Sequence, residues 1–305
     1  MAAIWTLRTI ARRLIGNTFA PPSRPISNDL TQLSWVLHLP PEELLQFRSG
    51  RRDPRYHYRP RQCEKRDGSP RQLYAPSPDL KAVQRALLHG YLDGLRVHPA
   101  ALGFRRGFNV ADNARRHLGQ AVVVTADIAD FFDHTSAQRV RNFFRAQDWD
   151  EITCSVLTGL CTFRGALPQG APTSPILSNL VNYELDEALI ALAGRSGGRY
   201  TRYGDDLTFS WASRRRPPSD AQRAVRRILL PYGYRLNRKK DWRVYRCHKG
   251  EEPRVTGIRL GRNGRLHPSR EIEQTMRRLR WQRDAESQAR LRGYEGFVEM
   301  LRGNW

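Results

Sequence analysis

The sequence is poor in cysteine and has no long apolar run. Its cysteines include no C-x-x-C pair and have no histidine at zinc-finger spacing, so neither a zinc site nor a disulfide framework is indicated. The four are Cys63, Cys154, Cys161 and Cys247. We therefore expect a reducing, cytoplasmic environment. No apolar run approaches the ~20 residues needed to cross a bilayer, which predicts that no membrane is a partner.

Acidic residues are missing from the beginning of the chain. None precedes Asp29, whereas arginines stand at positions 8, 12, 13 and 24. This composition is typical of a transit peptide and also of a basic helix that lies on nucleic acid, and the sequence leaves both interpretations open. We treat residues 1–30 as a basic N-terminal extension.

Positive charge is present in large excess. Among 305 residues, 52 Lys and Arg stand against 30 Asp and Glu, which leaves a net charge of +22. Such an excess argues against a small neutral substrate and favours nucleic acid over an anionic membrane. Only five of the basic residues are lysines. Arginine prefers bidentate phosphate geometry, although a GC-rich genome would produce the same bias.

Hydrophobic periodicity mixes helices and strands without strict alternation, which favours an α+β fold. The apolar run at 122–126 predicts a buried strand. Apolar residues at 207, 209 and 211 alternate with Thr208 and Ser210, which predicts a hairpin over 200–211 with one buried face. A basic hairpin is expected over 48–71 and a further strand over 255–260. Helices are predicted over 30–39, 41–47, 80–95, 112–118, 135–147, 152–160, 175–193, 219–230 and 268–301.

Three carboxylates follow or join the predicted strands. Asp127 ends a buried strand, where a charge is costly unless it is paired or metal-bound. Asp205 and Asp206 are adjacent at a hairpin tip, where they repel each other. Taken singly, each site has a simpler explanation: a salt bridge to arginine for Asp127, and a solvated acidic turn for Asp205 and Asp206. Together they match a site for two Mg²⁺ ions about 3.5–4 Å apart, which in a basic protein indicates polynucleotide chemistry.

The segments around these carboxylates resemble the motifs of reverse transcriptases. Residues 125–132 (TADIADFF) resemble motif A, residues 167–175 (LPQGAPTSP) motif B, and residues 203–206 (YGDD) motif C. Gly233 and the run 236–240 (LNRKK) resemble motif D. Order and spacing also match, and the resemblance extends over about residues 50–300.

Two shorter motifs narrow the resemblance to bacterial retron reverse transcriptases. Residues 113–117 (NARRH) match N-A-x-x-H, and residues 255–257 match V-T-G. Asn113 and His117 are four apart and share a helix face; a helix cap and a packed histidine are the plain alternative. Two other functions stay open: a small reverse transcriptase of the abortive-infection or CRISPR-associated type, and a non-catalytic RNA-binding scaffold with a relic palm.

The resemblance implies a right-hand polymerase fold, whose palm is an antiparallel sheet with helices on one face. The implied domains are fingers over 31–120, including the N-A-x-x-H region, a palm over 121–258 and a short RNA-binding thumb over 259–305. A finger segment of about 150–175 interrupts the palm.

The resemblance also assigns roles in the active site. Asp127, Asp205 and Asp206 would be catalytic and would hold two Mg²⁺ ions with the Ile128 carbonyl. One ion would lower the pKa of the primer hydroxyl, and the other would hold the triphosphate and stabilise the leaving pyrophosphate.

Further residues would contact the incoming nucleotide. Lys65 and Arg71 would bind triphosphate oxygens, and Lys240, next to Lys239, would donate a proton to pyrophosphate. Phe132 would exclude a ribose 2′-OH, while its neighbour Phe131 is expected in the core. The other implied nucleotide contacts are Asp130, Gln169 and Gly170. The implied RNA contacts are Asn113, His117, Val255, Thr256, Gly257, Arg277 and Arg280.

The resemblance finally implies partners. They are deoxynucleoside triphosphates, a cognate structured non-coding RNA and its DNA product. Family members prime from an internal guanosine 2′-OH, which leaves a branched RNA–DNA (msDNA), and act with an accessory effector protein in phage defence. Since the chain ends at Trp305, with no room for an RNase H domain, we expect a separate RNase H and a short thumb without a last helix.

Overall fold

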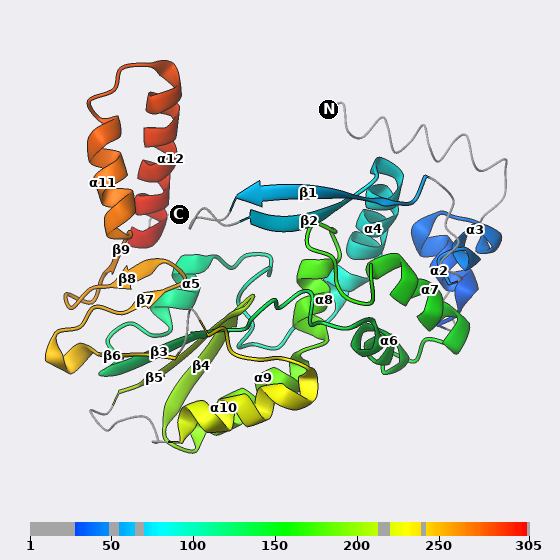
Figure 1. Cartoon of the computed structure of the whole chain (residues 1–305), viewed down its shortest axis with the longest axis horizontal. Coiled ribbons are helices and arrows are strands. Elements are labelled where there is room, and N and C mark those ends of the chain that lie inside the picture. Colours follow the sequence, from blue (N-terminus) through cyan, green and yellow to red (C-terminus); the bar gives the residue numbers. More distant parts are fainter. Residues whose placement is uncertain (1–27, 49–54, 65–69, 213–219, 239–241, 304–305) are drawn as a thin grey trace. The chain divides into compact units, whose positions relative to one another are not determined.

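The computed structural model describes residues 28–48, 55–64, 70–212, 220–238 and 242–303. The chain forms two compact units (Figure 1). Unit 1 contains the described residues up to Arg96 together with Phe132–Val181, and unit 2 contains Val97–Phe131 together with Asn182 onward. These units cut across the predicted domain limits, because residues 97–120 and 259–303 both group with the sheet that carries the aspartates. Nearly all of the predicted N-terminal extension lies outside the described residues.

Unit 1 consists of helices and one antiparallel hairpin. Its hairpin is β1 (Tyr58–Glu64) and β2 (Pro70–Pro76), paired with Cys63 opposite Arg71, as the sequence predicts. Asp29, Ser77, Ser136 and Asp150 begin four of its helices by accepting backbone N–H bonds. The helices are α2 (Leu30–Leu37), α3 (Pro41–Leu45), α4 (Pro78–Gly90), η1 (Leu92–Gly94), α6 (Ala137–Arg145), α7 (Glu151–Cys161) and α8 (Ser174–Leu180).

Close packing joins the elements of unit 1. The buried Gln84 amide of α4 donates to the Tyr58 hydroxyl at 2.7 Å and to the Leu160 carbonyl at 2.9 Å, so that it links β1 to α7. A Cβ at Gly159 would lie 1.9 Å from the Phe47 carbonyl oxygen. Only glycine therefore allows α7 to approach the end of the α3 segment this closely.

Unit 2 is built on a four-stranded antiparallel sheet with the order β4-β5-β3-β6. The strands are β3 (Val122–Asp127), β4 (Gly198–Tyr203), β5 (Asp206–Trp211) and β6 (Arg243–Arg246). The accompanying helices are α5 (Val110–Arg115), α9 (Tyr183–Gly194) and α10 (Ala221–Leu229), with the short turns η2 (Leu230–Tyr232) and η3 (Cys247–Lys249). The mixture of helices with antiparallel sheets confirms the α+β class.

Helices cover both faces of this sheet, and the prediction of helices on one face was wrong. Tyr200 and Arg202 hydrogen-bond to Asp186 of α9, whereas Thr201 between them bonds to α5. Because side chains alternate along a strand, α5 and α9 lie on opposite faces (Figure 1). Thr208 and Ser210 were expected at a solvated face, but they lie on the face that α5 covers and are only 1% and 0% exposed.

Three predicted elements are interrupted by turns. The helix expected over 175–193 is two helices, α8 and α9, which break at Val181 and Asn182. The strand expected over 255–260 is a hairpin of β7 (Arg254–Val255) and β8 (Ile258–Leu260), joined by β9 (Leu266–His267) in a three-stranded sheet. The tail is the helix pair α11 (Arg270–Leu279) and α12 (Ala285–Arg302).

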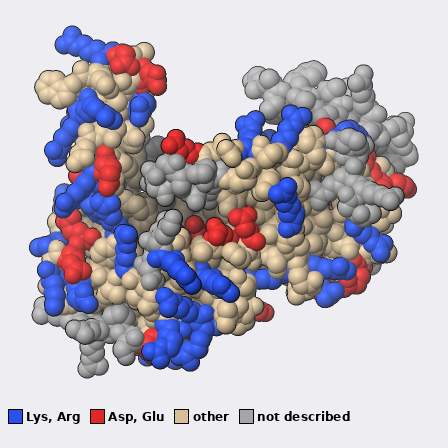
Figure 2. All heavy atoms as spheres, in the orientation of Figure 1, with Lys and Arg blue, Asp and Glu red and all other residues tan. Residues whose placement is uncertain are grey.

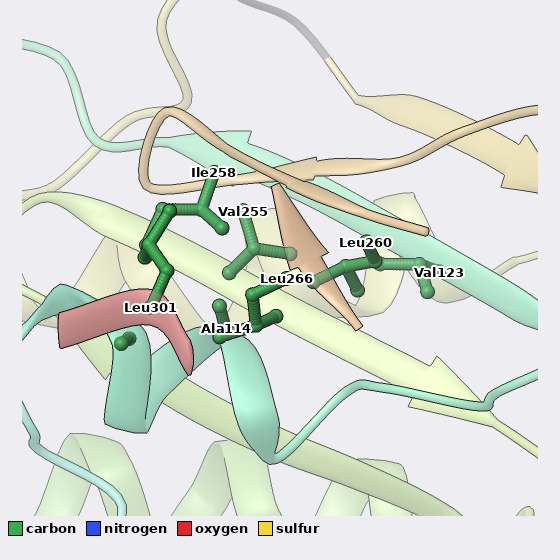
Figure 3. Packing of buried hydrophobic residues seen from close by; sticks show 8 residues of the cluster. Ala114, Val123, Val255, Ile258, Leu260, Leu266 and Leu301 are labelled. Carbon is green, nitrogen blue, oxygen red and sulfur yellow. The ribbon is translucent and has the colours of Figure 1, made fainter. Parts of the chain in front are cut away.

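One hydrophobic cluster connects α5, β3, the small sheet and α12 (Figure 3). Ala114 of α5 packs with Val123 of β3, Val255 of β7 and Leu301 of α12. This shared core explains why the C-terminal helix pair belongs to unit 2. No helix in the described ranges is long and apolar enough to cross a membrane. All four cysteines are described, and no disulfide joins them.

Candidate active site

The three predicted catalytic aspartates converge at one end of the β3–β5 pair. Asp127, the last residue of β3, stands opposite Asp206, the first residue of β5. Asp205 occupies the two-residue turn before β5, and its carbonyl accepts the Ile128 N–H at 2.9 Å. The tertiary structure thus brings residues from two distant segments, including Ile128, to one place.

Asn237 holds Asp127 in position. Its side-chain amide donates to the Asp127 carboxylate at 2.8 Å, and its backbone N–H donates to the Asp127 carbonyl at 2.8 Å. Asp127 is 4% exposed, so these bonds stabilise a nearly buried carboxylate. Asn237 lies in the segment that resembles motif D, and the resemblance gives it no role in the site. The asparagine next to a basic run was the available signal.

The hairpin tip that carries Asp205 is braced from the side. Gly204 takes a left-handed φ of +64°, which suits the first position of a tight hairpin turn. The backbone of Gly103 lies against this turn, since a Cβ at Gly103 would be 2.6 Å from the Gly204 nitrogen. The Leu102 N–H also donates to the Arg202 carbonyl at 2.8 Å. Nothing in the sequence pattern had indicated this support.

A buried ion pair lies beneath the tip. Arg202 and Asp186 are both 0% exposed, and the guanidinium binds both carboxylate oxygens, at 2.9 Å and 2.7 Å. Arg202 also donates to the Gly204 carbonyl at 3.2 Å, and the Tyr200 hydroxyl donates to Asp186 at 2.8 Å. The pair therefore links α9 to the aspartate-bearing turn. The missed signal was an arginine two residues after Tyr200, on the same face of a predicted strand.

On the opposite face, a buried hydrogen-bond chain joins α5 to both strands of the hairpin. Thr201 donates to Asn113 Oδ1 at 2.6 Å, so its oxygen accepts from His117 Nε2 at 2.7 Å. His117 Nδ1 then accepts from the Ser210 hydroxyl at 2.7 Å. Burial, with a smaller effect of Arg199 and Arg116, lowers the pKa of His117 to about 3. The imidazole is consequently neutral, and because Nε2 donates to Thr201, Nδ1 is left to accept from Ser210.

The segments that carry the two short motifs pack in the same part of the fold. The Thr256 hydroxyl donates to the Val110 carbonyl at the start of α5, at 3.5 Å, and Val255 packs in the cluster that contains Ala114. Arg115, within N-A-R-R-H, donates to the Met300 carbonyl near the end of α12 at 2.9 Å. The helix α5 thus connects the sheet, the V-T-G turn and the C-terminal helix.

This arrangement corrects part of the predicted RNA-binding set. Asn113, His117 and Val255 are each 0% exposed, so their side chains have no surface to offer RNA. They instead position the hairpin and the small sheet. Thr256 and Gly257 form the turn between β7 and β8 with φ of +48° and +82°, and both keep exposed surface. The helix α5 was expected to begin at Asp112, but it begins three residues earlier, with Asn109 as its N-cap. Asp112 is the N3 residue of a capping box, and its side chain accepts the Asn109 N–H.

The predicted nucleotide contacts divide between the described units. Asp130 is exposed in unit 2 with a left-handed φ of +45°. Within unit 1, the Gln169 carbonyl accepts the Tyr74 N–H at 2.8 Å. A Cβ at Gly170 would lie 2.9 Å from the Tyr74 carbonyl, so glycine is needed for this approach to β2. Phe132 is half-buried in unit 1.

Three predicted residues can be placed only in part or not at all. Lys65 and Lys240 lie outside the described residues. Arg71 is described only by its backbone pairing in β2.

Phe131, expected in the core, is 3% exposed and stacks on Tyr234 with ring centroids 5.4 Å apart, which confirms that expectation.

The donor atoms at the aspartate cluster are carboxylate and carbonyl oxygens, the ligands that Mg²⁺ prefers. Their chemistry therefore fits a divalent cation. Within the described ranges, no three Asp, Glu, His or Cys side chains already lie close enough together to hold a metal ion.

Comparison with known families identifies the family of this chain. A family model described as "Reverse transcriptase (RNA-dependent DNA polymerase)" matches residues 63–260, which include every element of the aspartate cluster. The chain belongs to the reverse transcriptase family. Reverse transcriptase domains generally use divalent metal ions, usually Mg²⁺.

Individual relatives confirm the resemblance to the retron type. The Retron Mx162 reverse transcriptase of Myxococcus xanthus is 36% identical in an alignment 283 residues long, which covers 81% of this chain and 58% of that protein. The Retron Ec86 reverse transcriptase of Escherichia coli is 36% identical over 190 residues, 62% of this chain and 58% of that protein. The Retron Mx65 reverse transcriptase of Myxococcus xanthus is 36% identical in an alignment 272 residues long, which covers 80% of this chain and 61% of that protein. The chain thus spans about three fifths of these relatives.

Proposed function

We propose that this chain is the RNA-directed DNA polymerase of a retron. The observation that carries the proposal is the register of β3 and β5, which sets Asp127 opposite Asp206 with Asp205 in the adjoining turn, in a chain of the reverse transcriptase family. A net charge of +22 supports a nucleic-acid substrate. The substrates would be an RNA template, a primer and deoxynucleoside triphosphates.

The aspartates would hold two Mg²⁺ ions together with the Ile128 carbonyl. Metal bound there would activate the primer hydroxyl and neutralise charge on the triphosphate. The protein's own part is positioning: Asn237 orients Asp127, and the Ile128 N–H fixes the Asp205 backbone. Lys65, Arg71 and Lys240 would bind or protonate phosphate oxygens. Gln169, Gly170, Asp130 and Phe132 would border the incoming nucleotide, with Phe132 set against a 2′-OH.

The cellular role would be the one that the resemblance to retron enzymes implies. The template would be part of a cognate structured non-coding RNA, primed from an RNA 2′-OH to give a branched RNA–DNA. Thr256, Gly257, Arg277 and Arg280 would contact that RNA. A separate RNase H would remove template, and an accessory effector would use the product in antiphage defence, in the cytoplasm.

Primer extension by the full chain, on an RNA template with an annealed primer in Mg²⁺, tests the polymerase. Asp205→Asn keeps the side-chain size but loses the charge, so incorporation should fall by orders of magnitude while RNA binding survives. Asp148→Asn is the matched control, because Asp148 is exposed and its left-handed φ of +61° suits asparagine. Normal incorporation by Asp205→Asn would end the proposal.

The retron assignment needs a second measurement. Total nucleic acid from cells that express the chain with its neighbouring non-coding RNA should contain an abundant, RNase-sensitive branched small DNA. Active primer extension without this product would assign the chain to another class of small reverse transcriptase.

A further inference from the structure

Phe104 has a backbone conformation that an aromatic residue rarely adopts. Its φ is +58°, in the left-handed region, where a bulky side chain is strained. The other non-glycine residues with a positive φ in the described ranges all have polar or charged side chains: His38, Asp130, Asp148, Arg164 and Thr256. Phe104 is also 42% exposed, so packing in the core does not explain the strain. Strained residues of this kind gather at functional sites.

Hydrogen bonds to β4 fix the backbone that leads into Phe104. The Arg202 N–H donates to the Ala100 carbonyl at 2.8 Å, and the Leu102 N–H donates to the Arg202 carbonyl at 2.8 Å. The buried His98 secures the start of this segment, because its Nδ1 accepts the Ala100 N–H at 3.1 Å. The surrounding structure therefore holds Phe104 in its strained conformation.

The ring of Phe104 lies against the turn that carries Asp205. A Cβ built at Gly204 would be 3.2 Å from two atoms of this ring, Cε2 and Cζ. The Tyr203 ring is next to it, with the two ring centroids 6.4 Å apart. Gly204 directly precedes Asp205 in the chain. Phe104 thus places a partly exposed aromatic ring one residue from a proposed catalytic carboxylate.

Basic side chains follow Phe104 in the sequence. Arg106 is exposed, and the Arg105 guanidinium lies over the Phe108 ring, 4.5 Å from its centroid. Lys and Arg side chains also cover much of the described surface on the face shown in Figure 2. Aromatic rings beside basic groups suit nucleotides, since a ring contacts base and sugar while guanidinium groups attract phosphate.

We propose that Phe104 contacts the terminal nucleotide of the primer and positions it for reaction. This inference rests on the proposed function, in which the attacking hydroxyl of the primer must reach metal held by Asp127 and Asp205. The nucleotide that carries this hydroxyl then lies beside the turn, next to the exposed part of the ring. The ring packs against its base and sugar and restricts the movement of the hydroxyl.

Single-nucleotide incorporation by the full chain in Mg²⁺ tests this contact with two DNA primers on one RNA template. One primer ends in a normal nucleotide, and the other ends in a nucleotide without a base. Phe104→Ala should lower kcat/KM about five- to 150-fold on the normal primer. On the abasic primer the same substitution should cost much less, because part of the contact is already missing. Phe104→Tyr keeps the ring and should retain most of the activity.

Further comparisons separate the ring from the backbone strain and from general effects. Phe104→Gly should unfold at a higher urea concentration than Phe104→Ala, because glycine adopts a positive φ without strain, yet it should lose as much kcat/KM. A primer that lacks an internal base should respond to Phe104→Ala as the normal primer does. Trp35→Ala, which removes another exposed aromatic side chain, should change kcat/KM on neither primer.

Three results would contradict the proposal in different ways. Equal losses in Phe104→Ala on the normal and the terminally abasic primer would overturn it, since the ring would then act on the turn and not on the primer. Parent-like activity of Phe104→Gly would overturn it as well, because the ring would not be needed. Absence of incorporation by the parent on every primer would overturn the proposed polymerase function, and this inference with it.

Discussion

The Thr201 hydroxyl donates to Asn113 Oδ1 at 2.6 Å, across 88 residues of sequence and with both side chains buried. His117 continues the chain of bonds from Thr201 to Ser210 on the neighbouring strand. The helix α5 therefore holds both strands of the hairpin whose turn carries Asp205. The N-A-x-x-H motif acts from within the fold, as a support of the aspartate cluster.

Asn113→Ala should reduce the free energy of unfolding by about 1–3 kcal/mol, because it leaves the buried Thr201 hydroxyl without its acceptor. If the proposed polymerase function is correct, synthesis should fall equally on a cognate structured RNA and on a generic annealed primer–template. Urea unfolding and primer extension on both substrates measure this. Asn142→Ala, on the exposed surface of α6, should change neither quantity. A loss confined to the cognate RNA would restore a recognition role for Asn113.

Stability should depend on pH through His117. Its pKa is about 3 in the folded state because of burial and the charges of Arg199 and Arg116, against about 6.5 when unfolded. Between these values the unfolded chain binds the extra proton, so this contribution is complete above about pH 6.5 and is lost as the pH falls toward 3. We expect a loss of about 2 kcal/mol from about pH 7 to pH 5.

His117→Gln provides the comparison for this pH dependence, since glutamine can hydrogen-bond but does not titrate. The free energy of unfolding of this variant, measured in urea, should fall less steeply over the same pH interval. The slopes of parent and variant should differ by up to ~1.4 kcal/mol per pH unit. Parallel pH profiles for parent and variant would show that His117 is not the group responsible.

Removing one partner of the Arg202–Asp186 pair should be costly. Asp186→Leu leaves a buried guanidinium uncompensated and should lower the free energy of unfolding by about 3–5 kcal/mol. Adding Arg202→Met should recover much of this loss, although the Tyr200 hydroxyl then lacks its acceptor. Chemical denaturation of the two single variants and the double variant forms a cycle. Additive losses would mean that the two residues do not stabilise each other.

Phe132 and Phe131 should differ in their effects although they are adjacent. Phe132→Ala should raise the use of ribonucleotides relative to deoxynucleotides, by a swing of ~2–4 kcal/mol if the ring excludes a 2′-OH by volume. Phe131→Ala should instead reduce stability by ~3–5 kcal/mol, because Phe131 is buried against Tyr234. Steady-state incorporation of matched nucleotide pairs measures the first effect. If Phe131→Ala relaxes sugar selection and Phe132→Ala does not, the alignment of residues 125–132 with motif A is displaced by one residue.

Local sequence patterns were sufficient for much of the architecture and for the aspartates. The apolar run before Asp127 and the alternation after Asp206 are short-range signals, and both strands form as predicted. The helix predicted over 175–193 failed at Val181 and Asn182, where apolar periodicity continues through a change of direction. Periodicity indicates where apolar side chains gather along an element, but not where one element ends and the next begins.

The amino-acid sequence by itself determined the α+β class, the basic character and the positions of Asp127, Asp205 and Asp206, because these depend on composition and on residues close together in the chain. Only the tertiary structure decided that Thr208 and Ser210 are buried, that Asn113 and His117 face inward, and that Arg202 meets Asp186. Each of these outcomes needs a partner from another element to satisfy a buried polar group. Such pairings arise from packing between distant segments, which no local pattern records.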